Sequence, residues 1–465
     1  MFKIITNSTT RFDEQCTKLI RRSIRSIHSN NRMSVTIEPT VPTNPNHRTN
    51  PNHRTNPNHR TGRYFTTHEY LQQSVLDLIS HPNIASTILE PSCGRGDLVD
   101  YIAQHLPKKS FDLYEIDRTI VPLPRIDAST IRYEDFLTAP ATPTRYQTIV
   151  GNPPYVKTST GNLYIDFIAK CFDLLEVSGE LIFIVPADFM KLTMASKLII
   201  RMMAAGTFTH IRRNHNETMF EEAAIDVLVF RYCRDPTLPR TISINSEEKV
   251  LVHTNGIVTF TTIDPGDDSV QLTELFHISV GMVSGKESVF KNAYHGTVDI
   301  LNGFDVVGGT VATQPNEPTA PIERIDRYIL YTEFPTPDPA TNVYLTANRP
   351  VLLARKIRRF DETNWFEWGA TRNRSTVEAH LGEECLYVSN ITRASTVCFK
   401  STIRLFGGGL IMLRPRNPLP NGGMDHIIAY LNSTEFKSNY MYAGRFKIGH
   451  KQLACAMIRW SVENY

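Results

Sequence analysis

The tetrapeptide Asn152-Pro153-Pro154-Tyr155 follows an apolar run at residues 146–150 and carries residue types that could activate an exocyclic amine. Such a nitrogen is a poor nucleophile because its lone pair is delocalised into the ring. The Asn152 side-chain oxygen and the Pro153 carbonyl, whose direction the fixed φ of proline presets, could each accept one N–H bond from it. Tyr155 could stack on the base and hold it in line. The pattern indicates attack by an amine on a methyl sulfonium; the simpler alternative is that Pro-Pro only ends a strand.

A second set of residues lies upstream and has the spacing of a nucleotide-like pocket. Residues 88–97 comprise a short apolar strand, an acid and a glycine-bearing turn that opens a helix, a turn that lets backbone amides approach a ligand closely. Residues 111–117 form a second strand that ends in Glu115, a carboxylate suited to a ribose diol. Residues 133–136 add an acid and an aromatic that could bond to and cover an adenine ring. The alternative is that these acids are ordinary solvated residues at strand ends.

Taken in order, these motifs resemble those of the gamma-class, TaqI-type DNA adenine-N6 methyltransferases of type II restriction-modification systems. The similarity extends to residues 62–69, which look like the family's amino-terminal cofactor motif, and to residues 162–164, 181–187 and 219–220. The glycine turn departs from the family's ideal because Ser92 stands at its first position. In the family this turn binds the methionine end of the cofactor S-adenosylmethionine, so the departure concerns that contact.

The resemblance implies S-adenosylmethionine as methyl donor, without a metal. The residues that it implies for cofactor binding are Thr66, Glu90, Ser92, Gly94, Gly96, Glu115, Ile116, Asp135 and Phe136. Those that it implies for the target adenine are Asn152, Pro153, Pro154 and Tyr155, with Phe220 packing against the base. For Phe220 the alternative is a core aromatic that precedes a buried strand.

The pattern of residues 64–235 predicts an α/β fold, because short apolar runs alternate with helix-length amphipathic segments. The resemblance makes this a seven-stranded, Rossmann-like S-adenosylmethionine-dependent methyltransferase domain whose last strand inserts antiparallel. The expected strands are residues 87–89, 111–114, 131–133, 146–150, 180–185, 209–212 and 225–232. The expected helices include residues 67–79, 97–105 and 163–175.

Three domains are predicted along the 465 residues. Residues 1–61 should be a disordered basic extension, because three copies of Thr-Asn-Pro-Asn-His-Arg offer no apolar face to bury. Residues 62–240 should form the catalytic domain. Residues 241–465, irregular and strand-rich, should form a mostly β or α+β target-recognition domain.

The net charge of +3 conceals an uneven distribution. Residues 349–465 carry 17 Lys or Arg against 9 Asp or Glu, whereas residues 64–348 are net acidic. A basic carboxy-terminal part beside an acidic catalytic part suits a module that tracks DNA phosphates. Candidate DNA contacts are Arg355, Arg358, Trp368, Arg372 and Arg374, which combine cations with an aromatic. The alternative is that the tryptophan is a core anchor and the arginines form a solvated rim.

Cysteine usage and hydropathy bound the environment of the chain. The seven cysteines are scattered without a Cys-x-x-Cys pair, which indicates neither a disulfide framework nor a zinc site. No apolar stretch approaches the roughly 18 residues that span a bilayer. We therefore expect a cytoplasmic protein, in a bacterial or virus-infected cell. The basic stretch before the repeats could touch DNA, act as a transit peptide, or precede a true start at Met33.

The function that these inferences predict is methylation of an adenine flipped out of duplex DNA, by a monomer with a possible separate restriction endonuclease acting at the same site. Two rivals remain open. Enzymes that methylate a glutamine amide of translation release factors carry the same tetrapeptide, although they lack a long appended DNA-reading part. The other rival is a non-catalytic DNA-binding protein on a methyltransferase fold.

Overall fold

The computed structural model describes residues 64–140, 144–158, 161–214, 219–220, 225–263, 266, 268–305, 322–442 and 444–460. The predicted basic extension at residues 1–61 lies outside this set.

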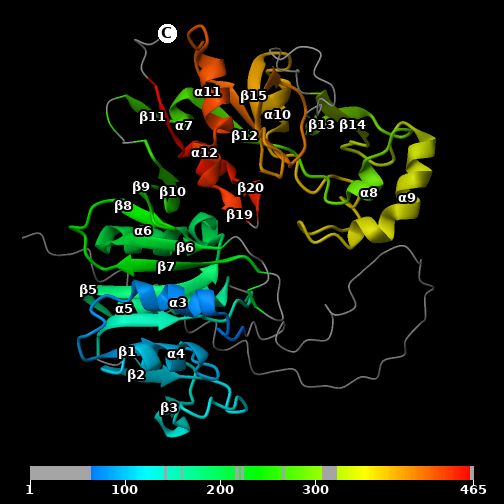
Figure 1. The fold of residues 1–465 in the computed structure, drawn as a ribbon. Coiled ribbons are helices and arrows are strands. Elements are labelled where there is room, and N and C mark those ends of the chain that lie inside the picture. The colour runs from blue at the N-terminus through cyan, green and yellow to red at the C-terminus, as the bar shows by residue number, and fades with distance from the viewer. Residues whose placement is uncertain are drawn as a thin grey trace, which may run out of the picture. The chain divides into compact units, whose positions relative to one another are not determined.

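The short apolar segments of the amino-terminal half pair into one large sheet, of strand order β10-β9-β8-β6-β7-β5-β4-β1-β2-β3. Strands β1 to β5 run parallel to one another, and β7 inserts antiparallel between β5 and β6 (Figure 1). The predicted seven-stranded arrangement with an antiparallel last strand is confirmed. Its strands are β1 (Ser86–Glu90), β2 (Lys109–Tyr114), β3 (Ile131–Arg132), β4 (Tyr146–Gly151), β5 (Leu175–Pro186), β6 (Thr207–Arg213) and β7 (Val227–Cys233).

Helices cover both faces of this sheet because β5 is apolar on both sides. Ile182 and Ile184 pack with the residues of α3 and α4, whereas Leu181 and Phe183 pack with those of α5 and α6. This alternation follows from the two-residue period of a strand, and continuous apolar runs are typical of doubly covered parallel strands. The helices are α3 (Glu69–Leu78), α4 (Asp97–His105), α5 (Leu163–Leu174) and α6 (Ser196–Ala205). The three predicted helices correspond to α3, α4 and α5.

Three further strands extend the sheet beyond β6, namely β8 (Thr241–Ile244), β9 (Glu247–Thr254) and β10 (Ile257–Thr261). β8 pairs parallel with β6, and tight turns then reverse the chain twice. The second turn is Asn255-Gly256, both with positive φ, the sequence that two-residue hairpin turns favour. The sheet therefore continues past residue 240, and the predicted division there stays a prediction.

The remaining described residues combine strands and helices in similar amounts, which is the α+β form of the prediction for the carboxy-terminal part. A four-stranded antiparallel sheet of order β12-β18-β15-β17 is its largest sheet, accompanied by a three-stranded sheet and two two-stranded antiparallel sheets, β11-β21 and β13-β14. Its strands are β11 (Ser269–Gln271), β12 (Phe276–Val280), β13 (Val298–Asp305), β14 (Ile322–Tyr328), β15 (Glu384–Ser389), β16 (Ile391–Thr392), β17 (Cys398–Thr402), β18 (Leu410–Pro415), β19 (Met441–Tyr442), β20 (Arg445–Lys447) and β21 (Met457–Arg459). Its helices are α7 (Leu272–Leu275), α8 (Glu287–Phe290), α9 (Pro339–Leu353), α10 (Arg374–Glu378), α11 (Gly423–Asn432), α12 (Thr434–Ser438) and α13 (His450–Ala454).

Within the described ranges, no helix has both the length and the apolar character needed to cross a bilayer.

Candidate active site

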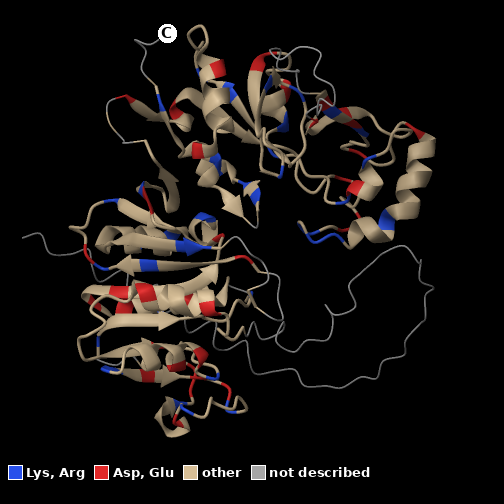
Figure 2. Cartoon of the chain, in the orientation of Figure 1, with Lys and Arg blue, Asp and Glu red and all other residues tan. Residues whose placement is uncertain are grey.

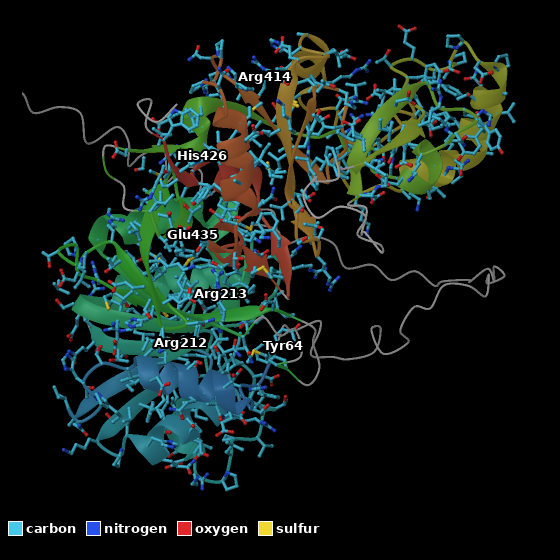
Figure 3. The ribbon with its side chains drawn as sticks, turned by 45° about the horizontal axis from the view of Figure 1, so that its top comes forward. Tyr64, Arg212, Arg213, Arg414, His426 and Glu435 are labelled. Atoms are coloured by element: carbon cyan, nitrogen blue, oxygen red, sulfur yellow. The ribbon has the colours of Figure 1, made fainter. Side chains whose placement is uncertain are left out.

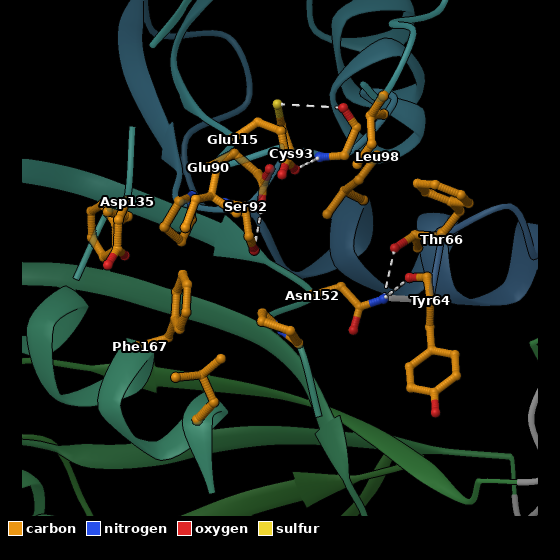
Figure 4. Close-up of a pocket in the computed structure, with 18 of the residues that line it drawn as sticks. Tyr64, Thr66, Glu90, Ser92, Cys93, Leu98, Glu115, Asp135, Asn152 and Phe167 are labelled. Atoms are coloured by element: carbon orange, nitrogen blue, oxygen red, sulfur yellow. Dashed lines mark hydrogen bonds between the residues drawn. The ribbon is translucent and has the colours of Figure 1, made fainter. Parts of the chain in front are cut away.

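Glu90, Glu115 and Asn152 stand at the carboxyl ends of β1, β2 and β4. Because these strands are parallel and adjacent, their ends meet at one edge of the sheet, where ligands of open α/β folds bind. A cavity of about 430 Å³ opens there (Figure 4). Of the predicted site residues, the cavity is lined by Thr66, Glu90, Ser92, Gly94, Glu115, Ile116, Asp135, Phe136, Asn152 and Pro154.

The glycine turn forms one wall because its backbone takes conformations that other residues rarely adopt. Gly94 has φ +57°, and its N–H donates to Glu115 Oε2 at 2.9 Å. Gly96 has φ +86° and stands immediately before α4, where a Cβ would lie 2.7 Å from Ile126. Gly96 is not among the residues that line the cavity, so in this structure it serves the turn and its packing.

Two carboxylates face the cavity from different environments. Glu90 is 2% exposed; its Oε1 lies 3.3 Å from the Ser92 N–H, and its Oε2 has no hydrogen-bond partner among the described residues. Burial, and to a lesser extent the charge of Glu115, raise the pKa of Glu90 well above its usual range. Both Glu115 oxygens accept backbone N–H groups, from Gly94 and from Asp117 at 2.9 Å, which fixes the carboxylate in place.

An apolar slot lies on the other side of the cavity, after β3. The Phe136 ring is buried and stacks on Phe167, with centroids 5.6 Å apart and an interplanar angle of 22°. Lys170 holds this loop by donating to the Phe136 and Ala139 carbonyls. The side chain of Ile116 is 66% exposed at the cavity, an unusual position for a large apolar residue. The slot can receive a flat ring system.

The side chain of Asn152 is held in one orientation. Its Nδ2 donates to the Tyr64 carbonyl at 2.8 Å and to Thr66 Oγ1 at 3.1 Å, which uses both amide hydrogens (Figure 4). Its Oδ1 lies 2.5 Å from the Tyr155 hydroxyl, which is also 3.1 Å from the Ile184 carbonyl. Burial raises the pKa of Tyr155, so this hydroxyl stays protonated and can donate. The amide oxygen is therefore an oriented acceptor.

Tyr155 and Phe220 do not line the cavity and instead form an aromatic cluster with Tyr64. The Tyr155 and Phe220 rings are 6.3 Å apart at 71°. The Tyr64 ring contacts both, at 5.5 Å from Tyr155 and 5.3 Å from Phe220. A base held between two rings needs them near-parallel and about 7–8 Å apart, since each contact takes about 3.5–4.0 Å. Tyr155 and Phe220, the two predicted base contacts, are thus close together but not spaced for a base between them, and the Tyr64 ring contacts both. Pro153 is buried and also lies outside the cavity lining.

The candidate DNA contacts of the carboxy-terminal part have two kinds of surroundings. Arg355 is buried and donates to the carbonyls of Leu352, Ser284, Glu367 and Trp365. Trp368 is buried and donates through Nε1 to the Ile329 carbonyl at 2.8 Å. Trp368 is thus placed as in the core-anchor alternative, whereas Arg355 lies in the interior and not in a solvated rim.

The three other arginines lie nearer the surface. Arg358 pairs with Glu367 at 2.5 Å, Arg374 pairs with Glu378 at 2.7 Å, and Arg372 donates to the Gly281 carbonyl. Arg358 and Arg374 line a second cavity of about 410 Å³. They remain candidate contacts.

Several cavity residues were absent from the sequence prediction. Tyr64 and Phe65 lie inside the recognised amino-terminal motif, but nothing in their residue types marked them as lining residues. Leu163 and Phe167 are four residues apart on α5, so the helical period could have placed both on the face next to Asn152. Across the described residues, no group of three or more His, Cys, Asp or Glu is arranged to hold a metal ion.

Comparisons with known proteins agree on the class of the catalytic part. Residues 122–220 match the family model described as Eco57I restriction-modification methylase, a span that includes Asn152 to Tyr155 and Phe220. The chain is 29% identical over 207 residues to the type II methyltransferase M.HincII of Haemophilus influenzae, covering 40% of each protein. It is 34% identical over 126 residues to the modification methylase CviBIII of Paramecium bursaria Chlorella virus NC1A, covering 22% of the chain and 31% of the relative.

The chain thus spans about two fifths of the length of the Haemophilus relative that it matches. Among solved structures, the type IIL restriction-modification enzyme MmeI in complex with DNA aligns at 10% identity and a TM-score of 0.46, over 81% of this chain and 63% of that one. The M protein of the type I restriction enzyme EcoKI aligns at 13% identity and a TM-score of 0.30, over 37% and 44%. The match at residues 122–220 and the two relatives lead to one conclusion: the chain carries an Eco57I restriction-modification methylase domain.

Proposed function

We propose that this chain transfers a methyl group from S-adenosylmethionine to the N6 amine of an adenine that has been turned out of duplex DNA. The observation that carries the proposal is the anchored amide of Asn152, which lies at the end of β4 beside a cavity lined by acids. The names of the two relatives, a type II methyltransferase and a modification methylase, support DNA as the substrate.

The cavity residues fit the chemistry of the cofactor. The unpartnered Oε2 of Glu90 suits the ammonium group at the methionine end, and a nearby cation would lower the raised pKa of this carboxyl. The fixed carboxylate of Glu115 retains lone pairs for ribose hydroxyls. Phe136 and Ile116 suit the two faces of an adenine ring, and Asp135 suits its amino group. When bound, S-adenosylmethionine supplies the methyl as an electrophilic sulfonium.

In this proposal Asn152 acts on the target amine through its oriented oxygen. The amine N–H takes the place of the Tyr155 hydroxyl at Oδ1, while the Pro153 carbonyl accepts the second N–H. Both bonds draw the nitrogen lone pair out of conjugation, and because the acceptors are held in advance they need little reorganisation. Tyr155 and Phe220 then stack on the base, which requires the Tyr64 ring to leave their cluster. The contacts must offset the few kcal/mol that base flipping costs.

The test is the variant Asn152→Ala in cells that carry an unmodified plasmid, followed by long-read sequencing of that plasmid. We expect N6-methyladenine in a fixed sequence context with the native chain and none with the variant. Exposed Asn83, before β1, supplies the matched control Asn83→Ala, which should methylate normally.

Two further measurements separate the possible failures. The purified Asn152→Ala variant should still bind S-adenosylmethionine and DNA; if it still transfers methyl groups, the role of Asn152 is refuted. If the native chain leaves plasmid adenine unmodified, the DNA proposal fails. Methylation of a release factor by the native chain would instead support the glutamine rival.

A further inference from the structure

A small pocket outside the cofactor cavity gathers three cationic side chains. Lys191 closes the single turn that follows β5, Arg213 is the last residue of β6, and Lys447 is the last residue of β20. All three line the pocket together with Tyr442 and Phe260. Figure 3 labels Arg213 at the end of its strand, and Figure 2 shows Lys and Arg at the end of β6 and on β20.

Aromatic rings hold two of these cations close together. The Lys191 and Lys447 ammonium groups lie 5.3 Å and 4.0 Å from the centre of the Tyr442 ring. The Arg213 guanidinium lies 5.6 Å from the centre of the Phe260 ring. Its Nε is buried and has no hydrogen-bond partner among the described residues.

The described part of the pocket holds no carboxylate at ion-pair distance from these cations. Among the described residues, none of these three cations has a carboxylate within ion-pair distance (4 Å). At longer range, Asp188 and Asp226 act on Lys191, and Asp226 also acts on Arg213. Burial, followed by the charge of Lys447, lowers the pKa of Lys191 to about 8. An anion between the cations would relieve both the repulsion and the loss of hydration.

The pocket lies along the same sheet edge as Asn152. The strand order β4-β5-β7-β6 and the parallel direction of β4, β5 and β6 place the residues that follow these strands on one edge. Asn152 follows β4 and Arg213 ends β6, so three strand spacings of about 4.8 Å separate them, roughly 15 Å in all. A DNA strand rises about 3.4 Å per nucleotide. A strand that runs along this edge from Asn152 reaches the pocket within a few nucleotides.

We propose that Lys191, Arg213 and Lys447 hold one phosphodiester of the DNA strand beside the target base. This inference rests on the proposed function and adds a binding site to it. The site fixes the register of the strand and reads no sequence, since a phosphate carries none. It also gives a reason why cations remain close together in a half-buried pocket.

The experiment measures DNA binding by the full chain as a function of salt. The double variant Lys191→Gln/Lys447→Gln keeps polar side chains of similar reach and removes two charges. We expect the slope of log affinity against log salt to fall in magnitude by about 0.9, the value for one phosphate contact. The ratio of native to double-variant affinity should then fall about 3.5-fold between 50 and 200 mM salt.

The matched control is Lys108→Gln, because Lys108 is exposed and precedes β2, at the opposite edge of the sheet. It should leave the slope unchanged. Duplexes with a single methylphosphonate locate the contact: one neutral linkage near the target should weaken native binding, and the double variant should be insensitive to that linkage. Methyl transfer by Lys108→Gln should equal that of the native chain at every DNA concentration.

Folding and function are checked separately. Removing repelling charges should leave the melting temperature of the double variant unchanged or raise it. If the double variant misfolds, the single variant Lys447→Gln replaces it in the salt titration. A double variant with the slope of Lys108→Gln overturns the phosphate site while native methylation stands. A native chain that neither binds nor methylates DNA overturns the proposed function, and the site falls with it.

Discussion

Thr66→Val tests whether the orientation of the Asn152 amide controls the rate. Valine keeps the shape of threonine and removes the Oγ1 that accepts an N–H from Asn152 at 3.1 Å. The side chain of Thr66 is 6% exposed and Asn152 is half-buried, so water can replace the lost acceptor only from the cavity that both residues line. The second amide hydrogen keeps its bond to the Tyr64 carbonyl, so the amide is loosened and not released.

The magnitude follows from the cost of an unsatisfied donor. Leaving a buried N–H without an acceptor costs about 1–3 kcal/mol. At 1.36 kcal/mol per factor of ten, this corresponds to a loss of about 5- to 160-fold if it is felt in the transition state. Thr66→Ser keeps the hydroxyl and loses one methyl group, so it should retain most of the rate.

The assay is single-turnover transfer of a tritiated methyl group to duplex DNA, with the Kd for S-adenosylmethionine measured separately. We expect Thr66→Val to lower the rate at saturating cofactor. If Thr66 served the cofactor alone, saturation would restore the rate and only the Kd would change. A Thr66→Val rate within about twofold of native, at saturating cofactor, refutes the orienting role.

Two predictions concern other parts of the catalytic domain. In the native chain the Arg231 Nε lies 2.7 Å from the buried carboxylate of Glu180. Arg231→Met leaves this carboxylate without its cation and should lower the free energy of unfolding by about 3–5 kcal/mol. The exposed pair of Arg201 with Asp173 provides the control, because Arg201→Met should cost only about 0–1 kcal/mol in the same urea titration. Tyr64→Ala should open the aromatic cluster and strengthen binding to a duplex with an unpaired target adenine about 2- to 10-fold, the worth of one or two aromatic contacts. Weaker binding in anisotropy measurements would mean that Tyr64 supports the base instead of occupying its place.

The position of the site was predictable because it depends on strand order. Glu90, Glu115 and Asn152 each follow an apolar run, and parallel strands bring their ends to one edge whatever the detailed packing. The seven-stranded sheet was predictable for a similar reason, since apolar segments of strand and helix length alternate along the chain. The extension by β8 to β10 was missed although Asn255-Gly256 is a strong hairpin signal, because the irregular pattern after residue 240 suggested a new domain.

The individual side chains of the carboxy-terminal part were not predictable from residue type. An arginine beside aromatics suits a DNA groove and a protein interior equally well, because carbonyls and phosphates both accept from a guanidinium. Arg355 donates to four carbonyls, a property of the tertiary fold that its sequence neighbours do not encode. Arg358 and Arg374 lie in the same stretch of sequence and remain at a cavity wall.

The aromatic cluster shows a further limit of prediction from motifs, because a motif does not say which rings contact one another. Tyr155 and Phe220 are far apart in sequence, and the motif predicts that each faces a base. Apolar rings gain by contacting each other, and the Tyr64 ring lies against both. The Tyr155 hydroxyl likewise occupies the Asn152 oxygen that the amine would need. Base entry therefore replaces the contacts of Tyr64 and of the Tyr155 hydroxyl with contacts to the base. The affinity for the base depends on the difference in free energy between these two sets of contacts.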